Sequence, residues 1–279
     1  MLTCTVRTLS ALLLLAASAV LFAATDQKTE QKIDQLMLVS GLKHAIERFP
    51  LEIEAQIKQQ QISNPDDALS NEESKLLFSH FKPDIIYDSL KQHLSNKLDP
   101  QSLNTLLAMH DAPLMKRIII AETAASSSKT EKEMGTYIDT LRHTPPPAAR
   151  IKLIQQLDRA AMSTESVLHI MQMMILGMNE MMAGRHDENS PAQRAQQQKM
   201  IANASHLIEG ELRQQIIMSM HYIYRDFTDE ELKNHITQLK RDESQYFTRT
   251  AIEGIGIVIL DAFKHGMKQL LQLRNARAV

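Results

Sequence analysis

The chain has no tryptophan and a single cysteine, Cys4, among its 279 residues. Cys4 lies in an N-terminal segment that we expect to be removed on export, so the mature protein would carry no thiol. Disulfide bonds and thiol catalysis are therefore excluded. The stability of the fold must come from buried apolar area instead.

Turn-forming and aromatic residues are also scarce, with 8 Gly, 9 Pro and an aromatic content of 4%. The plentiful residues are Leu, Ile, Met, Ala, Gln, Glu and Lys, which favour helices. Scarce aromatic side chains argue against carbohydrate platforms and base-stacking surfaces. The formal net charge of −2 provides no general attraction to nucleic acid or to anionic lipid, so we predict no nucleic-acid partner.

The first residues, 1–24, have the pattern of a secretory signal peptide. Arg7 precedes an apolar run, Leu9–Ala24, which ends in small residues. At about 16 residues this run is short for a membrane span, which needs about 20. We predict cleavage after Ala23 or Ala24, an exported periplasmic protein that is soluble after cleavage, and no other transmembrane span. The alternative is a segment that stays uncleaved as an N-terminal anchor.

Helical periodicity continues through most of the remaining chain. Ser70 with Glu73 has the pattern of a capping box, and Asp99 and Thr228 have that of helix N-caps. Pro50 is expected to begin a helix at its first position, where the missing N–H costs little. The sequence predicts an all-α fold, a multi-helix bundle of about ten helices.

Two short segments, Ser126–Ser128 and Pro145–Pro147, indicate a boundary between two helical lobes. The predicted organisation is a signal peptide over 1–24, an N-terminal helical lobe over 25–125, a connecting segment over 126–160 and a C-terminal helical lobe over 161–279. Leu98–Leu103 aligns weakly with Phe227–Leu232, which suggests that the lobes are related by duplication. Shared capping chemistry in two unrelated helix–turn–helix units explains the pattern equally well, and both interpretations stay open.

Part of the chain resembles a bacterial exported family called domain of unknown function 2059. The segments that carry the resemblance follow the signal peptide and are Leu38–Leu42, Leu98–Leu103 and the break at Asp111–Pro113. The sequence departs from the family at this break, where Met109 and His110 replace an aromatic pair and Lys116 replaces a glycine. The resemblance covers residues 30–125, with a fainter match over 211–255. It implies a periplasmic helical protein of unknown activity and assigns no catalytic residue.

Methionine is concentrated in one stretch, with six methionines between Met171 and Met182. Their spacing fits a stripe of core residues, a groove for an apolar ligand or partner, or a site for Cu(I), which prefers soft thioether sulfur. The candidate metal ligands are Met171, Met174, Met178 and His169. The candidate groove residues are Met171, Met174, Met178, Met181, Ile255 and Ile259.

Signatures of catalysis are missing from the sequence. It contains no Gly-x-Ser-x-Gly, no His-Glu-x-x-His and no phosphate-binding glycine loop. We predict no catalytic residue and no cofactor, and a non-catalytic binding or interaction module of the bacterial cell envelope. Its partner would be an unknown envelope protein or an apolar ligand. Two alternatives stay open: periplasmic copper binding through the methionine-rich helix, and hydrolysis of an envelope polymer.

Overall fold

A computed structural model describes residues 27–63, 69–125, 128–183 and 208–277. These residues form α-helices joined by short breaks, and they contain no strand. The predicted all-α, multi-helix fold is therefore confirmed. The predicted signal peptide lies outside the described residues. Within them, every helix is too short or too polar to cross a membrane.

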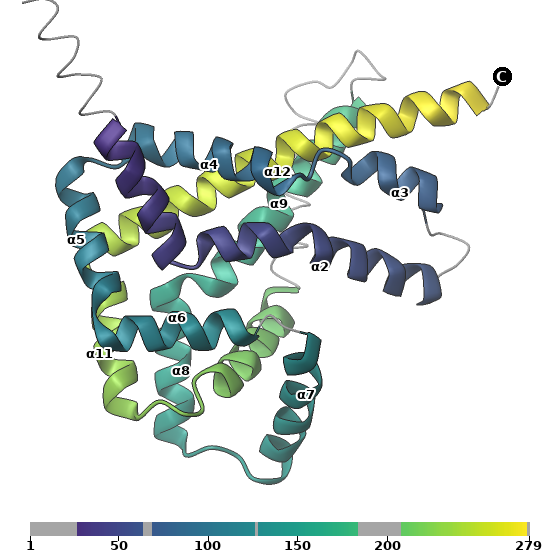
Figure 1. Ribbon diagram of the computed structural model, residues 1–279. Coiled ribbons are helices and arrows are strands. Elements are labelled where there is room, and N and C mark those ends of the chain that lie inside the picture. The colour runs from purple at the N-terminus through teal and green to yellow at the C-terminus, as the bar shows by residue number, and fades with distance from the viewer. Residues whose placement is uncertain (1–26, 64–68, 126–127, 184–207, 278–279) are drawn as a thin grey trace, which may run out of the picture.

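The helices follow one another in a simple order (Figure 1). The first half contains a helix over 27–39, then α2 (Leu42–Ser63), α3 (Asn71–Phe78), α4 (Pro83–Lys97), α5 (Pro100–Asp111) and α6 (Pro113–Ala125). The second half contains α7 (Ser128–His143), α8 (Ala148–Ala161), α9 (Ser163–Ala183), a helix described over 208–223, α11 (Asp229–Leu239) and α12 (Asp242–Arg277).

Side chains at the helix starts make the capping bonds that the sequence predicts. Ser70 accepts a hydrogen bond from the backbone N–H of Glu73, whose carboxylate accepts one from the N–H of Ser70. Thr228 and Glu231 form a second capping box at α11, and Asp99 caps α5. Each bond satisfies an N–H group that a helix start leaves unpaired, and is worth about 1 kcal/mol.

The prediction that Pro50 begins a helix is wrong. Pro50 lies inside α2, and the chain breaks earlier, at Gly41, where φ is +81°. Glycine adopts positive φ without steric cost, so Gly41 ends the helix over 27–39. Pro50 removes one backbone hydrogen bond from α2. Phe49 packs against Phe81 with ring centroids 5.9 Å apart, and tertiary packing of this kind sustains a helix beyond its intrinsic propensity.

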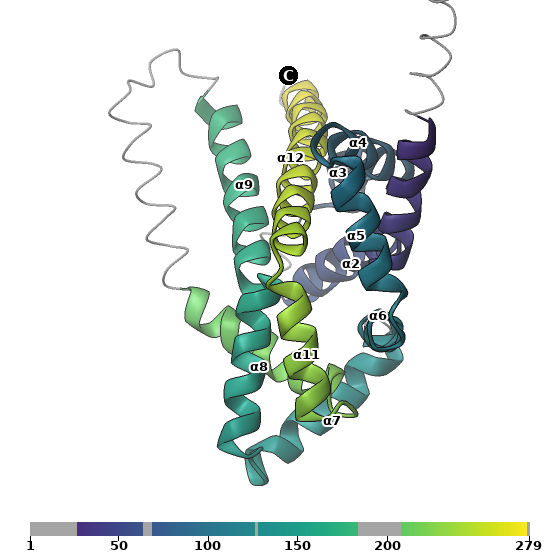
Figure 2. The same cartoon turned by 90° about the vertical axis from the view of Figure 1, so that its left-hand side faces the viewer.

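The long helix α12 lies at the centre of the bundle and packs against α3, α4 and α9 (Figure 2). Gly254, Gly256 and Gly266 allow α4, α9 and α3, respectively, to approach its backbone. The closest approach is at Gly266, where a Cβ atom would lie 1.8 Å from the backbone oxygen of Leu77. Backbone cannot rotate aside as a side chain can, so this position requires glycine.

Three buried apolar clusters stabilise the described part of the chain. The first joins the helix over 27–39, α2, α4 and α5 to α12, and the second joins α6 to α8, the helix over 208–223 and α11. The third joins α3 and the residues after it to α12. Each cluster draws residues from both sides of the predicted connecting segment, 126–160. The division into two lobes stays a prediction.

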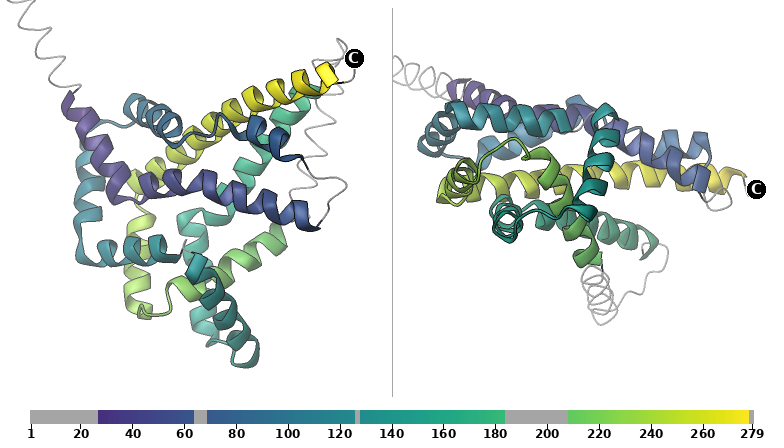
Figure 3. Two further views of the ribbon diagram at one scale, coloured as in Figure 1. Left: turned by 45° about the vertical axis from the view of Figure 1, so that its right-hand side comes forward. Right: turned by 90° about the horizontal axis from the view of Figure 1, so that it is seen from below.

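Helices in the second half form two columns that lie side by side (Figure 2). In one column α9 follows α8 end to end, and in the other α12 follows α11. The columns are in contact along their sides, where α9 packs against α12 and α8 packs against α11. Met162, in the left-handed conformation with φ 55°, is the single residue between α8 and α9. α7 lies at the edge of the bundle (Figure 3), where Tyr137 packs edge-on against Tyr222.

Candidate functional site

The breaks between consecutive helices converge on one pocket of about 520 Å³. Four breaks contribute: Gly41 before α2, Ala112 between α5 and α6, Met162 between α8 and α9, and Lys240–Arg241 between α11 and α12. The residues that flank these breaks and line the pocket are Ser40, Leu42, Met109, His110, Met115, Ala161, Ser163, Leu239 and Ser244. We call these four junctions the helix corners.

Most of the pocket lining is apolar. Branched aliphatic, methionine and phenylalanine side chains supply it, including Ile119, Ile170, Ile216, Met220, Ile223, Phe247, Ile252 and Ile255. No lysine, arginine or aspartate occurs among the described residues that line it. A volume of about 520 Å³ is within the range of pockets that enclose one small organic molecule, about 300–1,000 Å³.

A tyrosine and a glutamate meet within this apolar lining. The Tyr224 hydroxyl donates a hydrogen bond of 2.5 Å to Oε1 of Glu122 on α6. Burial raises the pKa of the Glu122 carboxyl group, and the hydrogen bond from Tyr224 opposes that rise. Burial and the neighbouring Glu122 carboxylate both raise the pKa of Tyr224 well above its usual range. The carboxyl group therefore takes up a proton more readily than an exposed glutamate does.

Two buried histidines lie beside this pair. His110 on α5 and His235 on α11 have exposed fractions of 7% and 3%, and the Tyr224 ring lies 6.2 Å from that of His235. The Nδ1 atoms of both histidines are buried without a hydrogen-bond partner in the described structure. Burial lowers the pKa of His110 to about 4, and burial together with the charge of His110 lowers that of His235 to about 4. Both rings are neutral at pH 7. We call Glu122, Tyr224, His110 and His235 the polar cluster.

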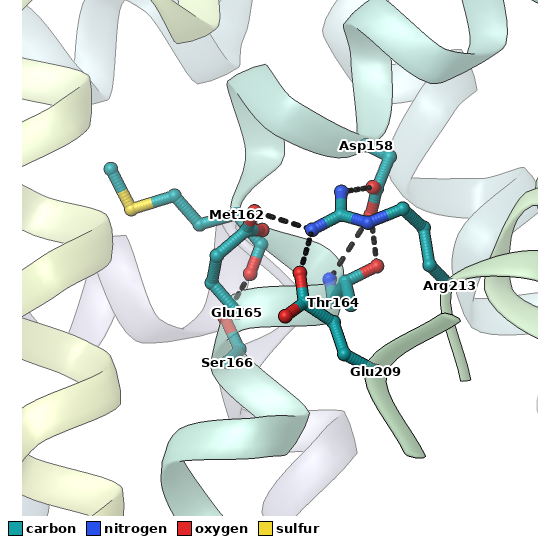
Figure 4. A network of polar contacts seen from close by, with 7 residues as sticks. All are labelled: Asp158, Met162, Thr164, Glu165, Ser166, Glu209 and Arg213. Carbon is teal, nitrogen blue, oxygen red and sulfur yellow. Dashed lines mark hydrogen bonds and ion pairs between the residues drawn. The ribbon is translucent and has the colours of Figure 1, made fainter. Parts of the chain in front are cut away.

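The helix corner at Met162 is held by a network of charged side chains (Figure 4). Oδ1 of the buried Asp158 accepts hydrogen bonds from the backbone N–H and the hydroxyl of Thr164, at 3.0 and 2.8 Å. Its Oδ2 atom accepts a bond of 2.6 Å from Arg213, which also contacts Glu165 and Glu209. The network ties α8, α9 and the helix over 208–223 together beside the pocket.

The structure describes the side chains of only some of the candidate residues predicted from the sequence. Met171 is exposed, His169 is half-buried and lies against Gly256 of α12, and the side chains of Met174, Met178 and Met181 lie outside the described part. Ile255 lines the pocket, whereas Ile259 is buried in the third apolar cluster. The copper site and the methionine groove therefore stay predictions. Among the described residues, no group of three or more histidine, cysteine, aspartate or glutamate side chains has metal-binding geometry.

Sequence reasoning did not identify the polar cluster. One signal was present, because His110 and His235 occupy positions on the apolar faces of their helices, in line with Leu106 and Leu232. A polar residue at such a position is buried and needs a partner. The sequence provides no sign that the two histidines meet, nor that Glu122 and Tyr224 join them.

Comparison with known proteins adds no relative. No family model, no curated protein and no solved structure matches the chain. The resemblance to the exported family of domain of unknown function 2059 stays a prediction.

Proposed function

We propose that the protein is an exported, non-catalytic binding module of the bacterial cell envelope that holds an apolar ligand in the pocket at the helix corners. The observation that carries the proposal is the pocket itself, which has a volume of about 520 Å³ and a largely apolar lining. Apolar surface exposed to water in an empty pocket is unfavourable, and an apolar molecule that covers it gains about 25 cal/mol for each Å² removed from water.

The arrangement of the polar cluster favours binding over catalysis. A catalytic histidine is usually oriented by a carboxylate or a carbonyl group and lies beside a nucleophile. The Nδ1 atoms of His110 and His235 have no such partner, and Glu122 accepts its described hydrogen bond from Tyr224. Hydrolysis of an envelope polymer is therefore the weaker proposal.

Export rests on the pattern of residues 1–24. N-terminal sequencing of the protein from the periplasmic fraction should return Ala24 or Thr25 as the first residue. A protein that remains in the membrane fraction and begins at Met1 would contradict the proposed cleavage and support the anchor.

Ligand binding is tested with N-phenyl-1-naphthylamine, a neutral apolar dye that fluoresces in apolar surroundings. The exported protein should bind the dye, and Thr248→Phe, which places a ring in the pocket from α12, should weaken binding about tenfold or more. Thr237→Phe is the matched control, because Thr237 is exposed on α11 and does not line the pocket. Absence of dye binding, or equal weakening by both variants, would overturn the proposal.

A native mass spectrum of the gently purified protein provides a second readout. A retained organic mass that is lost in Thr248→Phe and kept in Thr237→Phe would identify the natural ligand of the pocket. A retained mass that both variants keep would place that molecule elsewhere on the protein.

A further inference from the structure

Glu122 supplies the one carboxyl group in the described lining of the pocket, and α6 directs it inward. Met115, Ile119 and Glu122 share one face of that helix, at positions i, i+4 and i+7, and all three line the pocket. Burial raises the pKa of Glu122, yet the residue is only half-buried. A side chain that protein atoms surround, and that still keeps accessible surface, borders an internal space. Glu122 therefore faces the pocket rather than the packed core.

One oxygen of this carboxyl group is available to a ligand. Oε1 accepts the hydroxyl of Tyr224, whereas Oε2 accepts no hydrogen bond from the described residues. Oε2 is also not among the described side-chain atoms that are buried without a partner, as the Nδ1 atoms of His110 and His235 are. A carboxylate oxygen only accepts hydrogen bonds. The accessible polar group of the cluster is therefore an acceptor, and it belongs to Glu122.

Serine hydroxyls in the lining add acceptors rather than donors. Ser166 and Ser219 donate their hydroxyl protons to backbone carbonyl oxygens of their own helices, over 2.5 and 3.0 Å. Ser244 donates its proton to the sulfur of Met109, over 3.3 Å. A hydroxyl group has one proton and two lone pairs, so each of these serines has only lone pairs left for a ligand. The ligand that fits such a lining is a hydrogen-bond donor.

The charge of the lining points in the same direction. It contains no lysine or arginine among the described residues, and His110 and His235 are neutral at pH 7. A carboxylate or phosphate group placed here would lose its hydration without gaining a countercharge, and it would lie near Glu122. An ammonium group gains a countercharge from Glu122, and it brings three N–H donors. Its positive charge also favours the ionised form of Glu122, which burial alone disfavours.

We propose that the pocket binds a hydrophobic amine, an apolar chain or ring that carries one ammonium group, with the ammonium group paired to Oε2 of Glu122. This inference rests on the proposed function and adds the chemical class of the ligand. The pocket volume, about 520 Å³, suits one molecule of this kind.

The first test compares three molecules that share a ten-carbon chain and differ in the polar group: decylammonium, decanoate and decan-1-ol. Each competes at pH 7.5 with N-phenyl-1-naphthylamine bound to the exported protein. Decylammonium should displace the dye at a concentration about tenfold lower than either of the others. If the dye binds but decanoate or decan-1-ol displaces it as well as decylammonium does, the inference is overturned and the proposed function stands. If the dye does not bind at all, the proposed function fails and the inference fails with it.

The role of Glu122 is tested with Glu122→Gln, which keeps an oxygen that can accept the Tyr224 hydroxyl and removes the charge. The variant should bind the dye and decan-1-ol as the wild type does, and its affinity for decylammonium should fall about tenfold. Glu133→Gln is the matched control, because Glu133 also accepts a tyrosine hydroxyl, that of Tyr222, but does not line the pocket. A preference for decylammonium that Glu122→Gln retains would overturn the inference.

A measurement on the wild-type protein keeps the test independent of variant folding. Glutamate labelled with ¹³C at the side-chain carboxyl carbon reports on ionisation and ion pairing, because both change the chemical shift of that carbon. Decylammonium should shift the resonance of one glutamate, the one whose pKa lies above the usual range. Carboxyl resonances that all stay unchanged while decylammonium displaces the dye would overturn the inference.

Discussion

Acid should destabilise this protein through His110 and His235, at a pH well above that at which carboxylates titrate. Both histidines have a pKa of about 4 in the folded protein, against 6.5 in an unfolded chain. The unfolded state therefore binds more protons below pH 6.5. Since stability rises with increasing pH wherever the unfolded state binds more protons, it should be highest above pH 6.5 and decline as the pH falls towards 4.

The size of this effect follows from the two pKa values. At pH 5 an unfolded histidine is almost fully protonated, whereas a folded one with a pKa of about 4 is mostly neutral. The difference lowers the free energy of unfolding by about 2 kcal/mol for each histidine, or about 4 kcal/mol for the pair. Globular domains are stable by only about 5–15 kcal/mol, so the loss is a large share of the total.

Urea unfolding of the wild type and of His110→Phe/His235→Phe, followed by far-UV circular dichroism at pH 8 and pH 5, measures this loss. The wild type should lose about 4 kcal/mol more than the double variant over this range. Comparing the two pH differences cancels any packing effect of phenylalanine. It also cancels the contributions of Glu122, whose raised pKa acts with the opposite sign, and of His221, whose pKa is lowered by burial and by Arg150.

His143→Phe, which changes an exposed histidine at the end of α7, is the control and should keep the full pH dependence of the wild type. Equal losses of stability in the wild type and the double variant would refute the reasoning. That result would mean that the two rings are already protonated at pH 5 in the folded protein, and that the pocket is more hydrated than its lining indicates.

Three further predictions concern the fold and the methionine-rich helix. Gly266→Ala should destabilise the protein by about 3 kcal/mol or more, because the added Cβ atom would collide with the backbone of α3. Gly135→Ala is the control: its Cβ atom would have no neighbour within 4 Å, so it should be neutral or slightly stabilising. Thermal unfolding of both variants measures the difference. Asp158→Ala should cost about 1–3 kcal/mol in urea unfolding, because Thr164 loses its buried acceptor while Arg213 keeps its ion pairs with Glu165 and Glu209. The exposed Asp139→Ala should cost less than about 0.5 kcal/mol, and similar losses in the two variants would contradict this account of the corner. If the methionine-rich helix binds Cu(I), the triple variant Met171→Leu/Met174→Leu/Met178→Leu should lose this binding, as measured by competition with a Cu(I) chelator. Unchanged binding in the triple variant would exclude the site.

The helices could be predicted because their signals are local. Ser70 with Glu73, and Thr228 with Glu231, each satisfy a helix start within four residues, so the pattern in the sequence is the interaction in the structure. The error at Pro50 has the complementary cause. A proline that favours a helix start in isolation lies inside α2, where the neighbouring Phe49 packs against Phe81, a residue distant in the sequence.

The site could not be predicted in the same way, because its residues meet only through the tertiary fold. Glu122 and Tyr224 are joined by one hydrogen bond between α6 and the turn before α11, and nothing local to either residue indicates the other. His110 and His235 were detectable only as polar residues on apolar helix faces. The methionine-rich stretch was the more conspicuous pattern, yet the described structure places its first member, Met171, on the exterior.

The pocket lies beside the four helix corners, which are the points where the long helices change direction. A 36-residue helix such as α12 is about 54 Å long, and it begins at one of these corners beside α9, which begins at another. For a rigid rod of that length, a tilt of about 5° at the corner moves the far end by about 5 Å. A change of a few degrees in the angle between the two columns would therefore produce its largest displacement at the distal ends of α9 and α12.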